Sequence, residues 1–244
     1  MKKNRTLILF LMLTMVMVNQ CFAQTHNTID LEVTQIHTLP DWYLQAQDNI
    51  MPDREKRYHR YSTDHASYLR IDSHNNNRFL LVERTKESLK LFFEPNSGEK
   101  IFVATCNLGI ASTKWSYDDQ YFCYQVITAA NDDFILGSVH VGKVENNELT
   151  DHSRLIENIS ITDTCWDLTS ERLVFADFHR LFIYFVKENK LCEIKPVWTD
   201  DPEGYPQRLD NFAFSPDGNS LIFRYLPSYW GDQSVHYEVK FPDK

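Results

Sequence analysis

The chain has 244 residues, 43% of them hydrophobic, and a formal net charge of −9 at pH 7. This length and composition suit one globular domain with a sizeable core, or two small domains. The acidic balance argues against nucleic acid and anionic lipid surfaces as partners, because both repel negative charge.

The first 23 residues have the features of a secretory signal peptide. A basic start is followed by an apolar run over residues 7–18, and Cys21 and Ala23 place small residues before a cleavage position at Gln24. An alternative makes Cys21 the lipidated first residue of a lipoprotein, although the residue before it is not small. We expect an exported protein, periplasmic or secreted, because no later apolar run reaches the ~20 residues of a membrane span.

Residues 24–244 are predicted to form a single domain. Residues 29–39 alternate apolar and polar side chains, which is typical of a half-buried strand. Residues 41–50 are predicted as a short helix that Pro52 closes. The segment 41–67 is the least strand-like part of this domain, so we expect a non-strand excursion there.

From residue 67 onward the pattern is strand, polar turn, strand, and it recurs four times. The polar residue that opens each turn recurs at intervals of 44, 51 and 48 residues (72 to 116, 116 to 167, 167 to 215). These residues are Asp72, Ser116, Asp167 and Ser215. A period in the forties with about four strands per unit is the signature of a β-propeller blade.

The last copy has the clearest turn chemistry. Pro216 presets φ at the second position, Asp217 tolerates the third position, and Gly218 accepts a positive φ. We expect the acidic residues of the four turns to be structural caps; they are Asp72, Asp118, Asp167 and Asp217. The aromatic residues Trp115 and Trp166 are expected to pack between blades.

Three of these segments resemble a known repeat. Residues 115–119 (Trp-Ser-Tyr-Asp-Asp), residues 166–167 (Trp-Asp) and residues 214–218 (Phe-Ser-Pro-Asp-Gly) resemble the W-S-P-D-G repeat of WD40-like propellers of the TolB type. The resemblance covers residues 68–244, and only the last copy is close. It implies a propeller fold and a tendency to bind proteins or ligands, and it transfers no functional residues.

We therefore expect an all-β chain that forms a small β-propeller of about four blades. The last unit lacks a fourth strand after Phe241, and the N-terminal strand has the length and alternation to supply it. Five blades, an open propeller and a β-sandwich are the alternatives.

The sequence shows no catalytic constellation. It contains no G-x-S-x-G elbow and no H-E-x-x-H, and its nine histidines lack metal-ligand spacing. We predict no catalytic residue, no metal and no cofactor. Four cysteines follow the signal segment, and they permit two disulfides in three connectivities, or buried free thiols. They are Cys106, Cys123, Cys165 and Cys192.

The leading hypothesis is a non-enzymatic exported propeller that binds a protein partner. Its predicted contact segment combines aromatics with Arg and His, residue types that occur often at interfaces. These residues are Trp42, Tyr43, Tyr58, His59, Arg60 and Tyr61. The same segment could instead plug one face of the ring. The alternative functions are a periplasmic glycoside hydrolase or lyase with acids at the channel mouth, and an immunity protein that neutralises a basic toxin. The oligomeric state is left open.

Overall fold

The computed structural model describes residues 27–96, 98–106, 108–130, 135–160, 163–177, 180–198, 208–226 and 234–242, without the side chains of residues 51–55, 197 and 198. The predicted signal segment, its cleavage position and Cys21 fall outside these residues. Within the described part, no helix is both long enough and apolar enough to cross a membrane.

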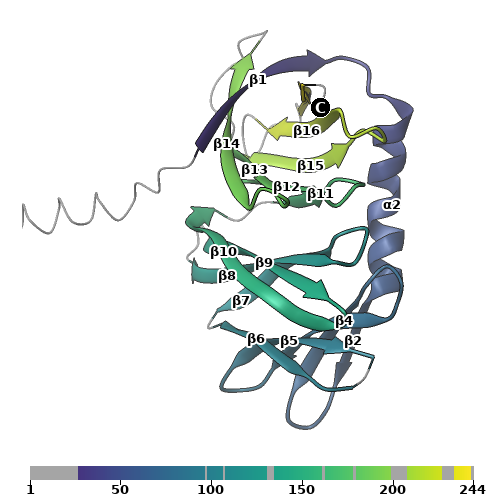
Figure 1. Ribbon diagram of the computed structural model, residues 1–244, viewed down its shortest axis with the longest axis vertical. Coiled ribbons are helices and arrows are strands. Elements are labelled where there is room, and N and C mark those ends of the chain that lie inside the picture. Colours follow the sequence, from purple (N-terminus) through teal and green to yellow (C-terminus); the bar gives the residue numbers. More distant parts are fainter. Residues whose placement is uncertain are drawn as a thin grey trace, which may run out of the picture.

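Strands dominate the part of the chain that the structure describes, which confirms the predicted all-β class, and there they form three sheets (Figure 1). The first sheet contains β2 (Tyr58–Ser62), β3 (Ser67–Asp72), β4 (Arg78–Arg84), β5 (Leu89–Pro95) and β6 (Ile101–Cys106). The second contains β7 (Gly109–Trp115), β8 (Tyr121–Ala130), β9 (Ile135–Glu145) and β10 (Glu148–Ser160). The third has the order β11 (Thr164–Trp166), β12 (Arg172–Ala176), β13 (Leu181–Phe185), β14 (Lys190–Trp198), β1 (Asn27–Ile36), β17 (Val235–Lys240), β16 (Ser220–Leu226) and β15 (Arg208–Phe214).

The third sheet consists of two antiparallel units that β1 joins. β1 pairs antiparallel with β17, where Val33 lies opposite Val239, and parallel with β14, where Leu31 lies opposite Pro196. The pairing of β1 with β17 was predicted, because the last unit lacks a fourth strand of its own. The parallel pairing with β14 is a further feature, which alternation alone does not predict. The described strands therefore form four antiparallel units in sequence order: β2–β6, β7–β10, β11–β14 and β15–β17.

An apolar core fills each space between successive units. Trp115 lies in the core between the first and second units, Trp166 in the next core, and Phe214 in the core between the third and fourth units. The Trp115 indole also donates a hydrogen bond of 3.1 Å to the Ile71 carbonyl of the first unit. The packing role predicted for Trp115 and Trp166 is confirmed, and the aromatic residue before each of these turns packs toward the preceding unit.

The segment after β1 differs from its prediction. Helix α2 (Asp41–Arg57) continues through Pro52 for five more residues, and Tyr58–Ser62 forms strand β2, where no strand was expected. Proline removes one hydrogen bond inside a helix, which is why a stop at Pro52 is the prediction from sequence. Helix α2 contacts β15 at one end and β2 and β3 at the other. Figure 1 shows α2 beside the four units, running from the fourth to the first.

The position of β1 gives a stability prediction. Val33 is fully buried between β14 and β17, so Val33→Ala should lower the free energy of unfolding by about 2–3 kcal/mol, from lost apolar burial and the cavity that remains. The neighbouring exposed Glu32→Ala should change it by less than about 0.5 kcal/mol. Urea denaturation of both variants checks this. Equal stabilities would show that β1 does not hold the two units together.

Candidate binding surface

Two of the predicted contact residues hold α2 and β2 in place. Tyr43 on α2 is 1% exposed, and its hydroxyl donates a hydrogen bond of 2.9 Å to the Asn211 carbonyl on β15. Burial raises the pKa of Tyr43 to about 12. Tyr58 on β2 donates to the Thr113 carbonyl on β7. Both acceptors lie at register shifts of their strands, where a bulge disrupts the ladder and leaves a residue unpaired. Tyr43 is thus inaccessible to a partner.

The other predicted contact residues are more accessible. Trp42 is half-buried and stands edge-on to the Tyr43 ring, while His59, Arg60 and Tyr61 are exposed. His59 Nε2 lies 3.1 Å from an Asp72 carboxylate oxygen. Of the six residues, only His59, Arg60 and Tyr61 lie on a sheet surface that a partner could reach.

The structure corrects the first repeat turn by one residue. In three turns the opening residue makes the same two backbone hydrogen bonds. Its amide donates to the carbonyl of the residue five positions later, and its carbonyl accepts from the amide of the residue three positions later. These opening residues are Ser116, Asp167 and Ser215. In the first unit Ser73 does this, with bonds to Arg78 and Asn76. Asp72 instead accepts a hydrogen bond of 2.5 Å from Arg70 Nε.

The turn side chains act within their own turns. Ser116 Oγ accepts from the Tyr121 amide at 2.9 Å and donates to the Asp118 carboxylate at 2.7 Å. Ser215 repeats this arrangement with the Ser220 amide and the Asp217 carboxylate. The hydroxyl bond from Ser215 lowers the pKa of Asp217. Pro216 and Gly218 complete the fourth turn, and Gly218 has a φ of +72°.

Neighbouring turns are also joined to each other. The Asp119 carboxylate accepts hydrogen bonds from the His74 and Asn75 amides of the first turn, at 2.7 and 2.8 Å. Arg172 donates from Nε to the Asp167 carboxylate at 2.7 Å and from Nη2 to the Gly218 carbonyl at 2.6 Å. Sequence reasoning missed these residues because their partners lie about 45 positions away.

The outer face of the first sheet carries a group of aromatic side chains that we name the aromatic face: Tyr61, Tyr68, Phe92 and Phe102. Tyr61 stacks on Tyr68 with centroids 4.9 Å apart, and Phe92 meets Phe102 edge-on at 6.0 Å. Lys100 Nζ lies 5.8 Å from both the Tyr68 and Phe92 rings.

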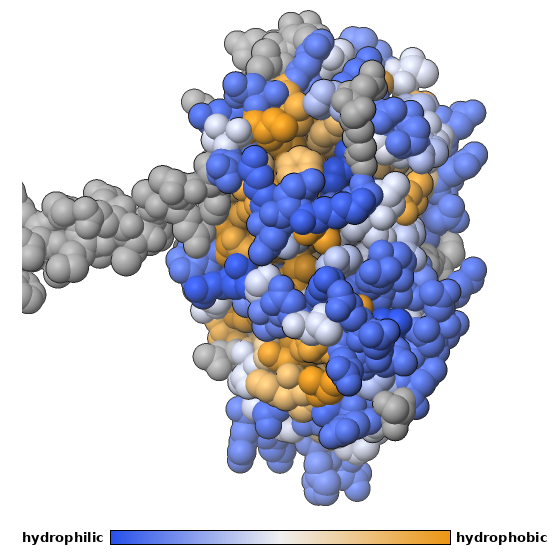
Figure 2. Space-filling model, in the orientation of Figure 1, coloured by the Kyte–Doolittle hydropathy of each residue, from blue (hydrophilic) through white to orange (hydrophobic). Residues whose placement is uncertain are grey.

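These rings point away from the core between the first and second units, because they alternate along their strands with core residues such as Leu91 and Phe93. Phe102 is 55% exposed and Tyr61 is 47% exposed. Figure 2 shows hydrophobic side chains gathered in the lower part of the view, where Figure 1 places β5 and β6.

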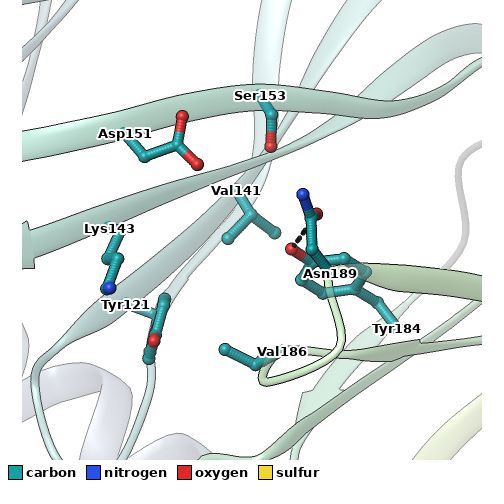
Figure 3. Close-up of a pocket in the computed structure, with 8 residues that line it drawn as sticks. All are labelled: Tyr121, Val141, Lys143, Asp151, Ser153, Tyr184, Val186 and Asn189. Atoms are coloured by element: carbon teal, nitrogen blue, oxygen red, sulfur yellow. Dashed lines mark hydrogen bonds between the residues drawn. The ribbon is translucent and has the colours of Figure 1, made fainter.

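A small pocket of about 160 Å³ lies between the second sheet and the turn after β13 (Figure 3). Its lining residues are Tyr121, Val141, Lys143, Asp151, Ser153, Tyr184, Val186 and Asn189. Tyr184 donates a hydrogen bond of 2.8 Å to Asn189, and Lys143 pairs with Glu145 at 2.5 Å. Asp151 is the one carboxylate among the eight, whereas a glycosidase site needs two.

Three stacked rings lie between the first and second units. Tyr124, His140 and His152 are mutually parallel within 14°, and Ser138 Oγ lies 2.8 Å from His140 Nε2. Burial, with His152 nearby, lowers the pKa of His140 to about 4. Among the described residues, no group of three or more His, Cys, Asp or Glu side chains could hold a metal ion.

The four cysteines of the described chain are free. Cys106, Cys123 and Cys192 are buried, and Cys165 is half-buried. Burial raises the pKa of the Cys123 thiol to about 11 and that of Cys165 to about 12, so both stay protonated and unreactive at neutral pH. These thiols match the buried alternative in the sequence analysis.

No family model and no curated protein matches the chain. Among solved structures it is similar to a putative TolB from Agrobacterium tumefaciens, with 11% identity and a TM-score of 0.43 over 78% of this chain and 75% of that one. A gluconolactonase from Xanthomonas campestris has 11% identity and a TM-score of 0.43, over 72% of this chain and 57% of that one. An oligogalacturonate lyase in complex with manganese has 13% identity and a TM-score of 0.42, over 68% of this chain and 46% of that one. The chain thus spans about half the length of the last two. At these identities and TM-scores, no residue of this chain is assigned a role from these proteins.

The buried pair of Arg172 and Asp167 gives a second prediction. Their side chains are 8% and 0% exposed, so Asp167→Asn leaves a buried guanidinium without its counter-charge and should cost about 3–5 kcal/mol of stability. Asp217→Asn is the matched control, because Asp217 occupies an equivalent turn but is exposed, and its melting temperature should stay close to that of the wild type. Similar losses in both variants would contradict the role of the buried pair.

The histidine stack gives a pH prediction. Unfolded His140 takes up its proton near pH 6.5 and folded His140 near pH 4, so the unfolded state binds more protons between these values. Its contribution to stability is complete above pH 6.5 and is lost as the pH falls toward 4. Urea denaturation at pH 7 and at pH 4.5 gives the free energy of unfolding at each pH. Its decrease from pH 7 to pH 4.5 should be smaller for His140→Gln than for the wild type or for the exposed control His65→Gln. Equal losses would show that His140 does not drive the change.

Proposed function

We propose that this chain is an exported β-propeller of about four blades and that it acts as a non-enzymatic module that binds a protein partner. The observation that carries the proposal is the aromatic face at the end of the row of units. Large apolar areas on a soluble protein mark interaction sites, and aromatic side chains are typical anchors at such sites. Phe102 and Tyr61 lie about half in solvent here.

The chemistry of the aromatic face suits a protein better than a small molecule. The rings spread over β2, β3, β5 and β6 rather than enclosing a cavity. Charges of both signs lie on the same face, with Arg70 and Lys90 near Glu83 and Glu94. A polar rim around an apolar centre is the usual composition of a protein interface. Tyr61 belongs to this surface, and the other tyrosines of the predicted segment, Tyr43 and Tyr58, support the fold.

Affinity capture from a periplasmic extract, followed by mass spectrometry, tests the proposal. Phe102→Ser should weaken the captured complex by about 1–3 kcal/mol, since it removes the most exposed ring of the aromatic face. Leu168→Ser is the matched control, because Leu168 is 47% exposed and lies in the third repeat turn, away from the first sheet. Binding that is equally strong in both variants would refute the aromatic face as the contact surface.

The enzymatic alternative has a separate test. A screen of polysaccharides should give no turnover if the chain works by contact alone. Turnover that disappears in Asp151→Asn, with an unchanged melting temperature, would place chemistry in the pocket and replace the binding proposal. Specific capture of a basic toxin would narrow the proposal to immunity.

A further inference from the structure

The four units differ in how they protect their outer edge strands. Exposed edges offer unpaired backbone groups to other chains, and propellers normally leave only short, protected edges. In the third and fourth units the outer strands β14 and β17 both pair with β1. Within the described residues, the outer strands β10 and β6 are paired on one side only, as are the first strands of the four units, β2, β7, β11 and β15.

β10 carries the protection that edge strands usually have. Its thirteen residues include five charged or titratable side chains: Glu148, Asp151, His152, Arg154 and Glu157. Its pairing with β9 shifts register at three places, and Asn158 has a φ of +58°. Charges and bulges of this kind prevent the addition of another strand.

β6 carries almost none of this protection. Its sequence is Ile-Phe-Val-Ala-Thr-Cys, with no charged residue and no proline, and it has one register shift, between Leu91 and Phe92 of its neighbour. Four of its six residues, Ile101, Phe102, Val103 and Thr105, are of types with high strand propensity. Phe102 and Thr105 are exposed on it. An uncharged edge of high strand propensity beside an exposed aromatic face is a ready template for one more strand.

We propose that β6 accepts an extended segment of the partner protein as a sixth strand of the first sheet. The inference rests on the proposed function and deepens it, because it names the mode of binding. Backbone N–H and C=O groups along the free edge are complementary to one kind of occupant, another extended backbone. Such main-chain bonds supply affinity, and the side chains that flank them supply specificity.

The neighbouring side chains define the segment. A segment of about six residues matches the six residues of β6, because two paired strands both rise about 3.3 Å per residue. Every second side chain would lie beside Phe102 on the aromatic face, where β-branched or aromatic residues pack best. Lys100 stands exposed just before β6 and forms no ion pair among the described residues, so an acidic residue at that end of the segment gains a partner.

Selection from a phage-displayed library of random nine-residue peptides tests the mode of binding on the full chain. We expect selected peptides to alternate β-branched or aromatic residues with polar ones, and to slow amide hydrogen exchange at residues 101–106. Thr105→Lys should weaken the best peptide at least tenfold, because a charge on the edge opposes strand addition. Thr150→Lys, at an exposed position of β10, should change its affinity less than twofold.

The outcomes separate this inference from the proposed function. Peptides that bind Thr105→Lys as well as wild type, or that leave exchange at β6 unchanged, overturn strand addition. If Phe102→Ser still abolishes partner capture in that case, the aromatic face binds the partner by side-chain contact alone. Concentration-dependent dimers that Thr105→Lys dissolves would overturn the inference by making a second copy the occupant. Melting temperatures confirm that each variant is folded.

Discussion

The constraint behind this structure is that each sheet has two faces and every apolar face needs a cover. In a row of four units the inner faces cover one another, with Trp115, Trp166 and Phe214 between them. The outer face of the fourth unit is covered by the start of α2, where Tyr43 packs on Ala213. The outer face of the first unit retains partly exposed rings. The candidate surface is therefore found where the row of sheets ends.

The repeat residues explain why the sequence reveals an architecture more readily than an activity. Ser116 and Asp167 satisfy amides of their own turns, and Asp119 and Arg172 join one turn to the next. Each of these polar groups has its hydrogen bonds within the protein. A motif made of such residues states how the units are built and joined, and it leaves the chemistry of any partner to other surfaces.

Local chemistry was predictable from sequence, and long-range pairing was only partly so. Turns and strand alternation depend on neighbouring residues, so the repeats and the strand character of β1 could be predicted. The first turn was placed one residue early because Asp72 and Ser73 can both open a turn, and only the backbone pairing selects Ser73. The contacts of α2 with β15 and β3 join segments far apart in the chain, and the sequence around Pro52 does not show them.

The aromatic face illustrates the part that sequence could not supply. Tyr61 and Phe102 lie about forty positions apart and share a face only because the sheet has the order β2-β3-β4-β5-β6. Phe102 reads in sequence as one more apolar residue of a strand, and its exposure follows from the absence of a further sheet against it among the described residues. Tyr58, in contrast, looked like a contact residue and is engaged with Thr113.

The position of β1 also sets the order in which this chain can fold. Its partners, residues 192–198 and 236–239, lie more than 150 positions further along. The first two sheets are built from neighbouring hairpins and can form early, whereas β1 can pair first with β14 and is paired on both sides only when β17 is available. Contacts of such long range are slow to form, and a strand that waits for them exposes its edges to other chains. For a chain that folds from its N-terminus, one edge of β1 thus stays open to other chains until β17 closes on it.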